Sequence, residues 1–239
     1  MNFADKMRVA IIGASGGIGE ALVNQLKNDS RVSQLYPISR TKTFGETIIM
    51  NYDDEETISE AAEFIKVDGP LDLVMVASGL LHNSSGVYPE KTFKSLDAVS
   101  LEQLYRVNVI GPALVAKHFI PLLSLGRKSV FATLGARVGS ITDNNLGGWY
   151  SYRMAKAALV MLTRTLAIET ARRNTSTICI ALHPGTVNTL LSKPFQRSVP
   201  GGSLVSPSNA AANLLRVIDN VGPDQSGHHL AWDGSRIPY

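Results

Sequence analysis

The sequence has a single cysteine among its 239 residues, which leaves no intrachain disulfide framework and no cysteine metal cluster to consider. Cys179 lies inside the apolar run STICIALHPG, so we expect it to be a core strand residue. The sequence also lacks any segment of eighteen apolar residues, and its N-terminus, MNFADKMRVAIIG, lacks the long apolar core of a signal peptide. We therefore expect a soluble cytoplasmic protein in a reducing compartment, with no membrane partner.

A strong excess of charge of one sign is missing as well. Lysine and arginine total 23 against 20 aspartate and glutamate residues, and the basic residues are scattered along the chain. Nucleic-acid binding requires basic residues clustered on one face, so nucleic acid is not an expected partner. A metal site is not expected either, because the adjacent His228 and His229 would point to opposite faces of a strand. The other histidines have no partner at metal-ligand spacing; they are His82, His118 and His183.

What the sequence does have is a regular alternation of apolar runs and helical patterns. The apolar runs are RVAIIG, SQLYPIS, TIIMN, LDLVMVAS, KSVFATL, STICIALHP and HHLAWDG. The expected helices cover residues 17–28, 55–66, 100–123, 150–173 and 206–219. Nearly continuous apolar strands separated by helices are typical of a parallel sheet that is buried on both faces. With 44% apolar residues and no linker, the chain is expected to form a single doubly wound α/β domain, residues 1–239, around a seven-stranded parallel sheet.

Two local patterns refine this expectation. Ser206 followed by Pro207 predicts the start of the last helix, with the serine as N-cap. Residues 190–205 contain two prolines, a Gly-Gly pair and mixed polarity. We expect this segment to be a mobile loop within the domain, and we interpret it as a lid.

The first apolar run leads directly into a glycine-rich turn, GASGGIG. Gly13, Gly17 and Gly19 stand where a strand passes into a helix, so a pyrophosphate group there would meet the free amides of the helix N-terminus. Ser15 and Ile18 belong to the same turn. The spacing GxxxGxG differs from the GxGxxG of the commonest dinucleotide fingerprint, so the turn alone indicates a dinucleotide site only weakly.

Tyr152 and Lys156 lie four residues apart in WYSYRMAKAALVMLTRTLAIE, which places a phenol and an ammonium group on one face of a helix. A positive charge at ~4–5 Å favours the phenolate by roughly 3–4 kcal/mol at an effective dielectric of ~20. We therefore expect Lys156 to lower the pKa of Tyr152 and to make the phenol a proton donor near neutral pH. The same pair occurs by chance on many helices, so its meaning depends on the rest of the sequence.

Five ordered motifs supply that context. They are GASGGIG, ASG at 77–79, VNVIGP with Asn108, YRMAK at 152–156, and PGTVNT at 184–189. Over almost the whole chain they resemble the short-chain dehydrogenase/reductase family. The stretches ARVGSITDNNLGGWYSYRMAKAAL and GHHLAWDGSRIPY are similar to the branch that contains the C-factor-like and sniffer-like carbonyl reductases. The resemblance implies a Rossmann fold and an oxidoreductase that uses a nicotinamide cofactor without a metal.

The resemblance also implies roles for individual residues. Tyr152 would donate a proton to a substrate carbonyl as hydride arrives from the nicotinamide, and Lys156 would also hold the nicotinamide ribose. Asn108 would hold a water that relays protons to Lys156, although the residues alone equally fit an asparagine that caps a helix kink. The resemblance also implies two groups of cofactor-binding residues. One is Ala77, Ser78 and Gly79, and the other, near the carboxamide of the nicotinamide, is Pro184, Gly185, Val187 and Thr189. For the second group, a simple Pro-Gly turn after a strand is the alternative.

The end of the second apolar run indicates which nucleotide binds. An acidic side chain at this position accepts the ribose hydroxyls of NAD, whereas an arginine pairs with the 2′-phosphate of NADP. The residues here are Ser39 and Arg40, so we expect NADP(H); the alternative is that Arg40 is an ordinary surface charge. Asn51 and Tyr52 replace the family's usual Asp–hydrophobic pair beside the adenine, and the asparagine can still hydrogen-bond the ring.

One expected catalytic group is absent. The family carries a serine three residues before a glycine after the fifth strand, where it hydrogen-bonds the developing oxyanion. Alignment on Gly139 puts Ala136 at that position and Gly135 before it. Ser140 is our candidate for a displaced donor and Thr133 the alternative, because a single oxyanion donor is typically worth a few kcal/mol. A serine after a glycine is also ordinary turn chemistry.

The function expected from these patterns is an NADPH-dependent reductase of a ketone or aldehyde. The alternative is a catalytically weak NADP(H)-binding sensor or signalling protein, which the missing serine suggests. Loops 80–95 and 190–205 would line a mostly apolar substrate site. A homo-oligomer, dimer or tetramer, is expected from the resemblance and from apolar residues on several faces of the expected helix 150–173. Burial within the monomer would explain these apolar residues equally. They include Leu159, Val160, Leu162 and Leu166.

Overall fold

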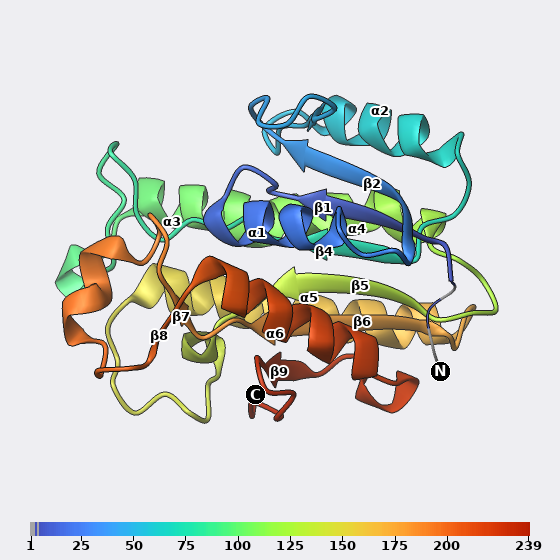
Figure 1. Cartoon of the computed structure of the whole chain (residues 1–239). Coiled ribbons are helices and arrows are strands. Elements are labelled where there is room, and N and C mark those ends of the chain that lie inside the picture. Colours follow the sequence, from blue (N-terminus) through green and yellow to red (C-terminus); the bar gives the residue numbers. More distant parts are fainter. Residues whose placement is uncertain (1–2, 4) are drawn as a thin grey trace.

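Seven parallel strands form one sheet in the order β3-β2-β1-β4-β5-β6-β9 in the computed structural model, which describes residue 3 and residues 5–239 (Figure 1). The strands are β1 (Met7–Ile12), β2 (Val32–Ser39), β3 (Ile48–Ile49), β4 (Leu73–Val76), β5 (Ser129–Leu134), β6 (Thr177–His183) and β9 (His229–Ala231). The doubly wound α/β fold predicted from the sequence is thereby confirmed. The strand order reverses between β1 and β4, and ligands of such sheets bind beside the carboxyl ends of the strands at this point.

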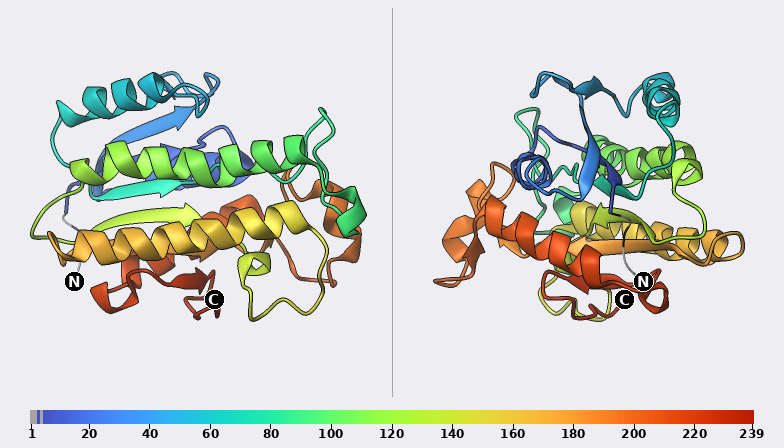
Figure 2. Two further views of the ribbon diagram at one scale, coloured as in Figure 1. Left: turned by 180° about the vertical axis from the view of Figure 1, so that it is seen from behind. Right: turned by 45° about the vertical axis from the view of Figure 1, so that its right-hand side comes forward.

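Helices cover both faces of the sheet, as the apolar strands predicted. One face carries α1 (Gly17–Leu26) and α6 (Pro207–Asn220), which are seen in front of the sheet in Figure 1. The other face carries α2 (Glu55–Lys66), α4 (Gly111–Phe119) and α5 (Tyr150–Ala171), and Figure 2 shows α4 in green and α5 in yellow across it. A further helix, α3 (Ala98–Tyr105), precedes α4 in the chain.

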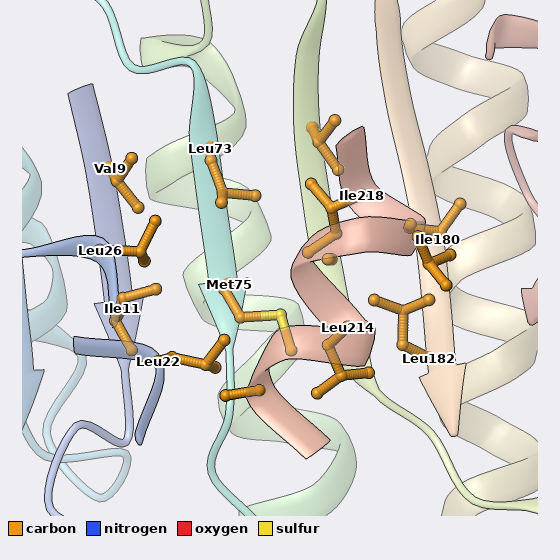
Figure 3. Packing of buried hydrophobic residues seen from close by; sticks show 14 of the residues in the cluster. Val9, Ile11, Leu22, Leu26, Leu73, Met75, Ile180, Leu182, Leu214 and Ile218 are labelled. Atoms are coloured by element: carbon orange, nitrogen blue, oxygen red, sulfur yellow. The ribbon is translucent and has the colours of Figure 1, made fainter. Parts of the chain in front are cut away.

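Successive side chains of a strand point to opposite faces of the sheet, so the apolar strands contribute to two apolar layers. In β1, Val9 and Ile11 point toward α1 and α6, where they join Leu22 (Figure 3). Ala10 and Ile12 belong to the cluster on the opposite face. Burying a side chain of this size contributes about 1.5–3 kcal/mol, so a strand with apolar residues at every position gains stability on both faces.

The predicted helix 100–123 is wrong as a single element. It consists of α3, a π-helical turn (Arg106–Ile110), α4 and a 3-10 turn (Ile120–Leu122). Pro112 has no N–H to donate to the carbonyl of Asn108, so regular α-helical hydrogen bonding cannot continue there. The amide of Gly111 instead bonds to the carbonyl of Arg106 in the wider π register. The sequence-based expectation of a kink around Asn108 is thus met by a π-helix.

Other boundaries also differ from the expected ones. The last strand begins at His229, so His228 lies outside it and the two histidines are not paired within one strand. The 190–205 segment is more regular than expected, since it contains a 3-10 helix (Lys193–Ser198) and a strand, β8 (Leu204–Val205), that pairs with β7 (Thr186–Val187). Whether it moves as a lid stays a prediction.

The start of α6 is as predicted, because the Ser206 side chain accepts a hydrogen bond from the amide of Asn209 at 3.1 Å. On α5, Leu159 and Val160 are buried in the monomer, and Leu166 packs against the core that holds α2 and α4. These apolar residues therefore serve the fold of the single chain. Among the described residues, no helix is both long and apolar enough to cross a membrane.

Candidate active site

The predicted site residues gather at one edge of the sheet. Gly13 follows β1, Arg40 follows β2, Ala77 follows β4, Gly135 follows β5 and Pro184 follows β6. Because the strands are parallel, all five positions lie at their carboxyl ends, on the left of Figure 1. The paired strands β7 and β8 lie at the same end (Figure 1).

The glycine-rich turn leaves no space for a side chain at Gly13 or Gly19. Gly13 has a φ of +84°, and a Cβ there would lie 2.6 Å from the amide nitrogen of Ser78. A Cβ on Gly19 would collide with the carbonyl oxygen of Gly13. The N-cap of α1 is Gly16, which has no side chain to cap the first turn. The first amides of α1 therefore face this edge without a side-chain cap, as a pyrophosphate-binding turn requires.

The segment after β6 lies against this turn. A Cβ on Gly17 would come within 2.8 Å of Thr189 Cγ2, so the two residues are in close contact. Gly185 adopts a φ of +80°, which turns the chain after β6, and Val187 is buried in β7. The structure thus brings the predicted residues of the 184–189 segment beside the turn that begins α1.

At the far end of the same edge, Arg40 is exposed directly after β2. Tyr52 is buried, and its hydroxyl group forms a 2.6 Å hydrogen bond with Ser78 Oγ. A Cβ on Gly111 would collide with the Tyr52 ring, which explains a glycine at the start of α4. Asn51 Oδ1 accepts a hydrogen bond from the amide of Asp53, which leaves its amide nitrogen as a donor for a ligand.

The proposed proton donor and its lysine lie in the first two turns of α5. Tyr152 and Lys156 are both buried, and Lys156 Nζ lies 5.6 Å from the centre of the Tyr152 ring. Lys156 Nζ donates a 2.8 Å hydrogen bond to the carbonyl of Leu134, the last residue of β5. This contact ties the start of α5 to the carboxyl end of β5.

Asn108 meets this pair through Gly79. A Cβ on Gly79 would lie 3.5 Å from Asn108 Oδ1 and 3.9 Å from Lys156 Nζ. The Asn108 side chain accepts from the amide of Leu80 at 3.1 Å and donates to the carbonyls of Leu80 and Leu104 at 2.8 and 3.0 Å. The asparagine therefore has a structural role in holding the loop after β4, and the same position puts it beside the lysine.

The pKa values of Tyr152 and Lys156 are shifted mainly by burial and not by the charge of the lysine. The expectation that Lys156 lowers the pKa of Tyr152 is wrong for the chain without cofactor: loss of solvent raises the pKa of this phenol. Loss of solvent also lowers the pKa of Lys156 to about 7. Each group is therefore favoured in its neutral form, which keeps the proton on Tyr152 at neutral pH.

The position of the missing serine lies against the apolar surroundings of the tyrosine. Ala136 packs against the apolar cluster that contains Tyr152. Ser140 is buried, and its hydroxyl oxygen accepts a 3.1 Å hydrogen bond from the amide of Asp143. Thr133 Oγ1 lies 3.5 Å from Thr163 Oγ1 on α5. Both candidate hydroxyls thus have partners of their own, and Ser140 as oxyanion donor stays a prediction.

Gly135 has a further reason to lack a side chain. A Cβ on it would lie 2.8 Å from Nε2 of His229 and 3.4 Å from Cβ of Ala181. His229 is buried, and among the described residues neither of its ring nitrogens has a hydrogen-bond partner. An imidazole thus occupies the space that a side chain at residue 135 would need.

The substrate side of Tyr152 is apolar and aromatic. Leu81, Val87 and Leu104 are buried with Tyr152, and Leu191 packs against them. Rings from both predicted loops meet above this cluster, since Phe195 lies 5.3 Å from Tyr88 and 5.0 Å from Trp149, between ring centres.

Sequence reasoning missed two residues here. Trp149 contacts the Tyr152 ring at 6.3 Å between ring centres, and it could have been suspected from its place directly before the Tyr152 helix. Glu90 hydrogen-bonds the first turn of α5. Nothing in the local pattern around Glu90 indicates this contact.

Comparison with known proteins agrees with this arrangement. Residues 7–199 match the short chain dehydrogenase family. A 1-hydroxy-2-glutathionyl-2-methyl-3-butene dehydrogenase of Rhodococcus sp. (strain AD45) is 31% identical over 97% of this chain and 99% of its own length. The C-signal protein of Myxococcus xanthus is 30% identical over 72% of this chain and 94% of its own length.

Among solved structures, an NADPH-bound carbonyl reductase from chicken fatty liver has the same fold. Its TM-score is 0.85 at 23% identity, and the match covers 98% of this chain and 99% of that one. The carbonyl reductase Sniffer of D. melanogaster has a TM-score of 0.78 at 18% identity, over 98% of this chain and 100% of that one. The family match, the relatives and the ordered site residues lead to one conclusion: the chain belongs to the short chain dehydrogenase family of nicotinamide-dependent oxidoreductases.

Proposed function

We propose that this protein is an NADPH-dependent reductase of a non-ionic ketone or aldehyde, with Tyr152 as the proton donor. The observation that carries the proposal is the convergence of three buried side chains at the end of β5. Tyr152 and Lys156 come from one helix, and Asn108 reaches the lysine across Gly79. A buried phenol beside a lysine and a dinucleotide turn is suited to protonating an oxygen during hydride transfer.

The residues at the carboxyl ends of the strands are suited to binding a dinucleotide. The turn of Gly13, Gly17 and Gly19 has room for backbone but not for side chains, and the amides of α1 that follow suit a pyrophosphate. Arg40 would pair with a 2′-phosphate, and Asn51 would hydrogen-bond the adenine. When bound, the cofactor supplies the hydride, which the protein's own side chains cannot.

The protein's own contribution is proton transfer and orientation. Tyr152 Oη holds the proton at neutral pH because burial raises its pKa, and it would release this proton to the carbonyl oxygen as negative charge develops there. Lys156, with a pKa lowered to about 7, is able to return a proton to the tyrosine after each turnover. Asn108 would hold the water that resupplies Lys156. Ser140 is the proposed oxyanion donor.

The lining supports an apolar carbonyl substrate. Leu81 and Val87 are buried in one cluster with Tyr152, and Leu191 and Phe195 pack against this cluster. Such a lining excludes water, which strengthens the hydrogen bond from the phenol to a developing oxyanion. The carbonyl reductase from chicken fatty liver, which has the same fold, was solved with NADPH bound, and this supports the same cofactor here.

Replacement of Tyr152 by phenylalanine tests the proposal. We expect Tyr152→Phe to lower kcat for NADPH oxidation at least about 100-fold, because a positioned general acid contributes about 10²–10⁴, and to leave NADPH binding intact. Activity is measured against a panel of quinones, diketones and aldehydes, and NADPH binding by fluorescence. Tyr150→Phe, at the first residue of the same helix, is the matched control and should keep wild-type kcat. Near-normal turnover of Tyr152→Phe would refute the proposal.

A second function is favoured by one observation. Ala136 packs against the cluster that contains Tyr152 and has no donor for an oxyanion, and the neighbouring Gly135 has none either. A protein that retained the dinucleotide site and lost this donor would suit a nucleotide-dependent sensor or signalling role. Tight NADPH binding by the wild type with no turnover across the whole panel would favour this reading over the reductase.

A further inference from the structure

Glu90 is a buried acidic residue at the end of the loop that follows β4, with 5% of its surface exposed. Both of its carboxylate oxygens are directed at a single residue 61 positions later in the chain, Ser151. Oε2 accepts a 3.2 Å hydrogen bond from the Ser151 amide, and Oε1 accepts a short hydrogen bond from the Ser151 hydroxyl group. Ser151 directly precedes Tyr152 and is itself fully buried.

The first turn of α5 has no cap of its own. Its N-cap residue is Trp149, which makes no side-chain cap hydrogen bond and adopts a φ of +54°, a left-handed conformation that is uncommon for a bulky residue. The Trp149 amide donates to the backbone carbonyl of Glu90 at 2.5 Å. Glu90 therefore replaces the missing local cap through both its backbone and its side chain, and its negative charge sits at the end of the helix that favours anions.

This contact joins the loop after β4 to the first turn of α5, two parts of the site whose relative position matters for Tyr152. Leu81 and Val87, on the same loop as Glu90, pack against Tyr152, and the ring of Trp149 meets the ring of Tyr152 edge-on. A movement of the first turn of α5 would displace the Tyr152 hydroxyl relative to both the loop and the cofactor turn. Misplacement by ~1 Å can cost ~100-fold in rate.

We propose that Glu90 is a positioning residue of the reductase: by holding Ser151 and Trp149 it fixes the first turn of α5 and so aims the Tyr152 hydroxyl at the substrate carbonyl. This inference rests on the proposed function. In the described part of the chain the hydrogen bonds of Glu90 go to Ser151 and Trp149, and none goes to the glycine-rich turn or to Thr189, so we expect its loss to affect the reaction step more than cofactor binding.

Glu90→Gln is the main test, because it keeps the shape of the side chain and removes one of its two acceptor oxygens. We expect kcat to fall about tenfold or more, within the range that a small misplacement of the reacting groups can produce, while the Kd for NADPH stays within about twofold because its own contacts are unchanged. Ser151→Ala loses the hydroxyl donor and keeps the amide contact, so its effect on kcat should be smaller. The double variant should be no slower than Glu90→Gln, because both changes act through one contact.

Asp97→Ala is the matched control. Asp97 caps α3 by accepting a 2.8 Å hydrogen bond from the Ser100 amide, and it is remote from Tyr152 in sequence and role. This variant should lose stability with kcat unchanged, which separates loss of a helix cap from misplacement of the phenol. Wild-type kcat in Glu90→Gln, or an equal loss of NADPH affinity and kcat, would overturn the proposal.

A crystal structure of Glu90→Gln with NADP⁺ gives a readout that does not depend on turnover. We expect the first turn of α5 and the Tyr152 hydroxyl to be displaced relative to the wild type, and an unmoved Tyr152 would contradict the positioning role. If the wild type reduces no carbonyl compound, the proposed function fails, and this comparison still decides whether Glu90 positions Tyr152. Should Glu90→Gln fail to fold, the same measurements on Ser151→Ala decide.

Discussion

At the scale of single residues, Arg40 is the position on which the choice between the two nicotinamide cofactors depends. It is exposed at the end of β2, and no acidic residue follows it directly. A guanidinium group can pair with a 2′-phosphate through two parallel hydrogen bonds, whereas NAD offers it no such group. The preference for NADP(H) should therefore reside largely in this one side chain.

We predict that Arg40→Asp weakens NADPH binding by tenfold or more, on the order of a charge-assisted pair worth about 1.5–3 kcal/mol, and leaves NADH binding unchanged or stronger. Dissociation constants for both cofactors, measured by fluorescence titration, test this. Lys193→Asp, an equally large charge reversal at an exposed residue of the 190–205 segment, is the control. Equal losses for NADPH and NADH would mean that Arg40 does not meet the phosphate.

At the scale of elements, the end of β5 and the start of β9 are coupled through Gly135 and His229. His229 lies in register with Ala181 on β6, and its ring fills the space beside Gly135. Burial lowers the pKa of His229 to about 4, so the ring is neutral at pH 7. Gly135, directly before Ala136, is therefore matched to a bulky neighbour two strands away.

We predict that adding a side chain with Gly135→Ser destabilises the protein, because the new Cβ meets the imidazole. His229→Ala removes the obstacle, so the double variant should be more stable than Gly135→Ser alone. Contacting residues typically show coupling of about 0.5–3 kcal/mol, and urea unfolding of all four proteins measures it. Gly45→Ser is the control, since a Cβ there has nothing within 4 Å. Strict additivity of the two changes would show that they do not interact.

At the scale of the whole molecule, burial of Lys156 links folding to pH. Its pKa is lowered from 10.5 to about 7 in the folded chain, whereas the unfolded chain regains the ordinary value. Below pH 7 the lysine is charged in both states, and the folded state bears the full cost of a buried charge. Between pH 7 and 10.5 the folded state has lost the proton and the unfolded state still binds it, so stability rises with pH over this window.

We predict that the free energy of unfolding of the wild type rises relative to Lys156→Met by about 2 kcal/mol between pH 7 and 9. Lys156→Met removes the titrating group and retains much of its volume. Urea denaturation of the cofactor-free proteins at several pH values gives the difference, from which other titrating groups cancel. A difference that is constant with pH would mean that Lys156 keeps an ordinary pKa in the fold.

Much of the architecture could be predicted because parallel strands buried on both faces have a distinct pattern. The run RVAIIG and its successors were recognisable as strands, and the order of strands and helices then restricted the topology. Gly13 and Gly19 were recognisable for a similar reason, since a turn with close backbone approach excludes every other residue type. The pair Tyr152 and Lys156 was singled out by helical spacing together with the ordered motifs that resemble the family.

The features that escaped prediction depend on contacts between distant segments. The contact of Glu90 with Ser151 and the match of Gly135 with His229 leave little trace in any local window. The direction of the pKa shift of Tyr152 was missed for another reason. The sequence shows that Lys156 carries a charge near Tyr152, but it does not show how far both groups are removed from solvent.

Thus the sequence by itself determined the layered α/β fold and the family, because periodicity, glycine spacing and ordered motifs are local properties of the chain. Only the tertiary structure decided how Tyr152 and Lys156 ionise and what holds their helix in place. The ionisation of the pair depends on which groups exclude water from it, and the position of the helix depends on which distant side chains contact it. Only folding brings these groups together.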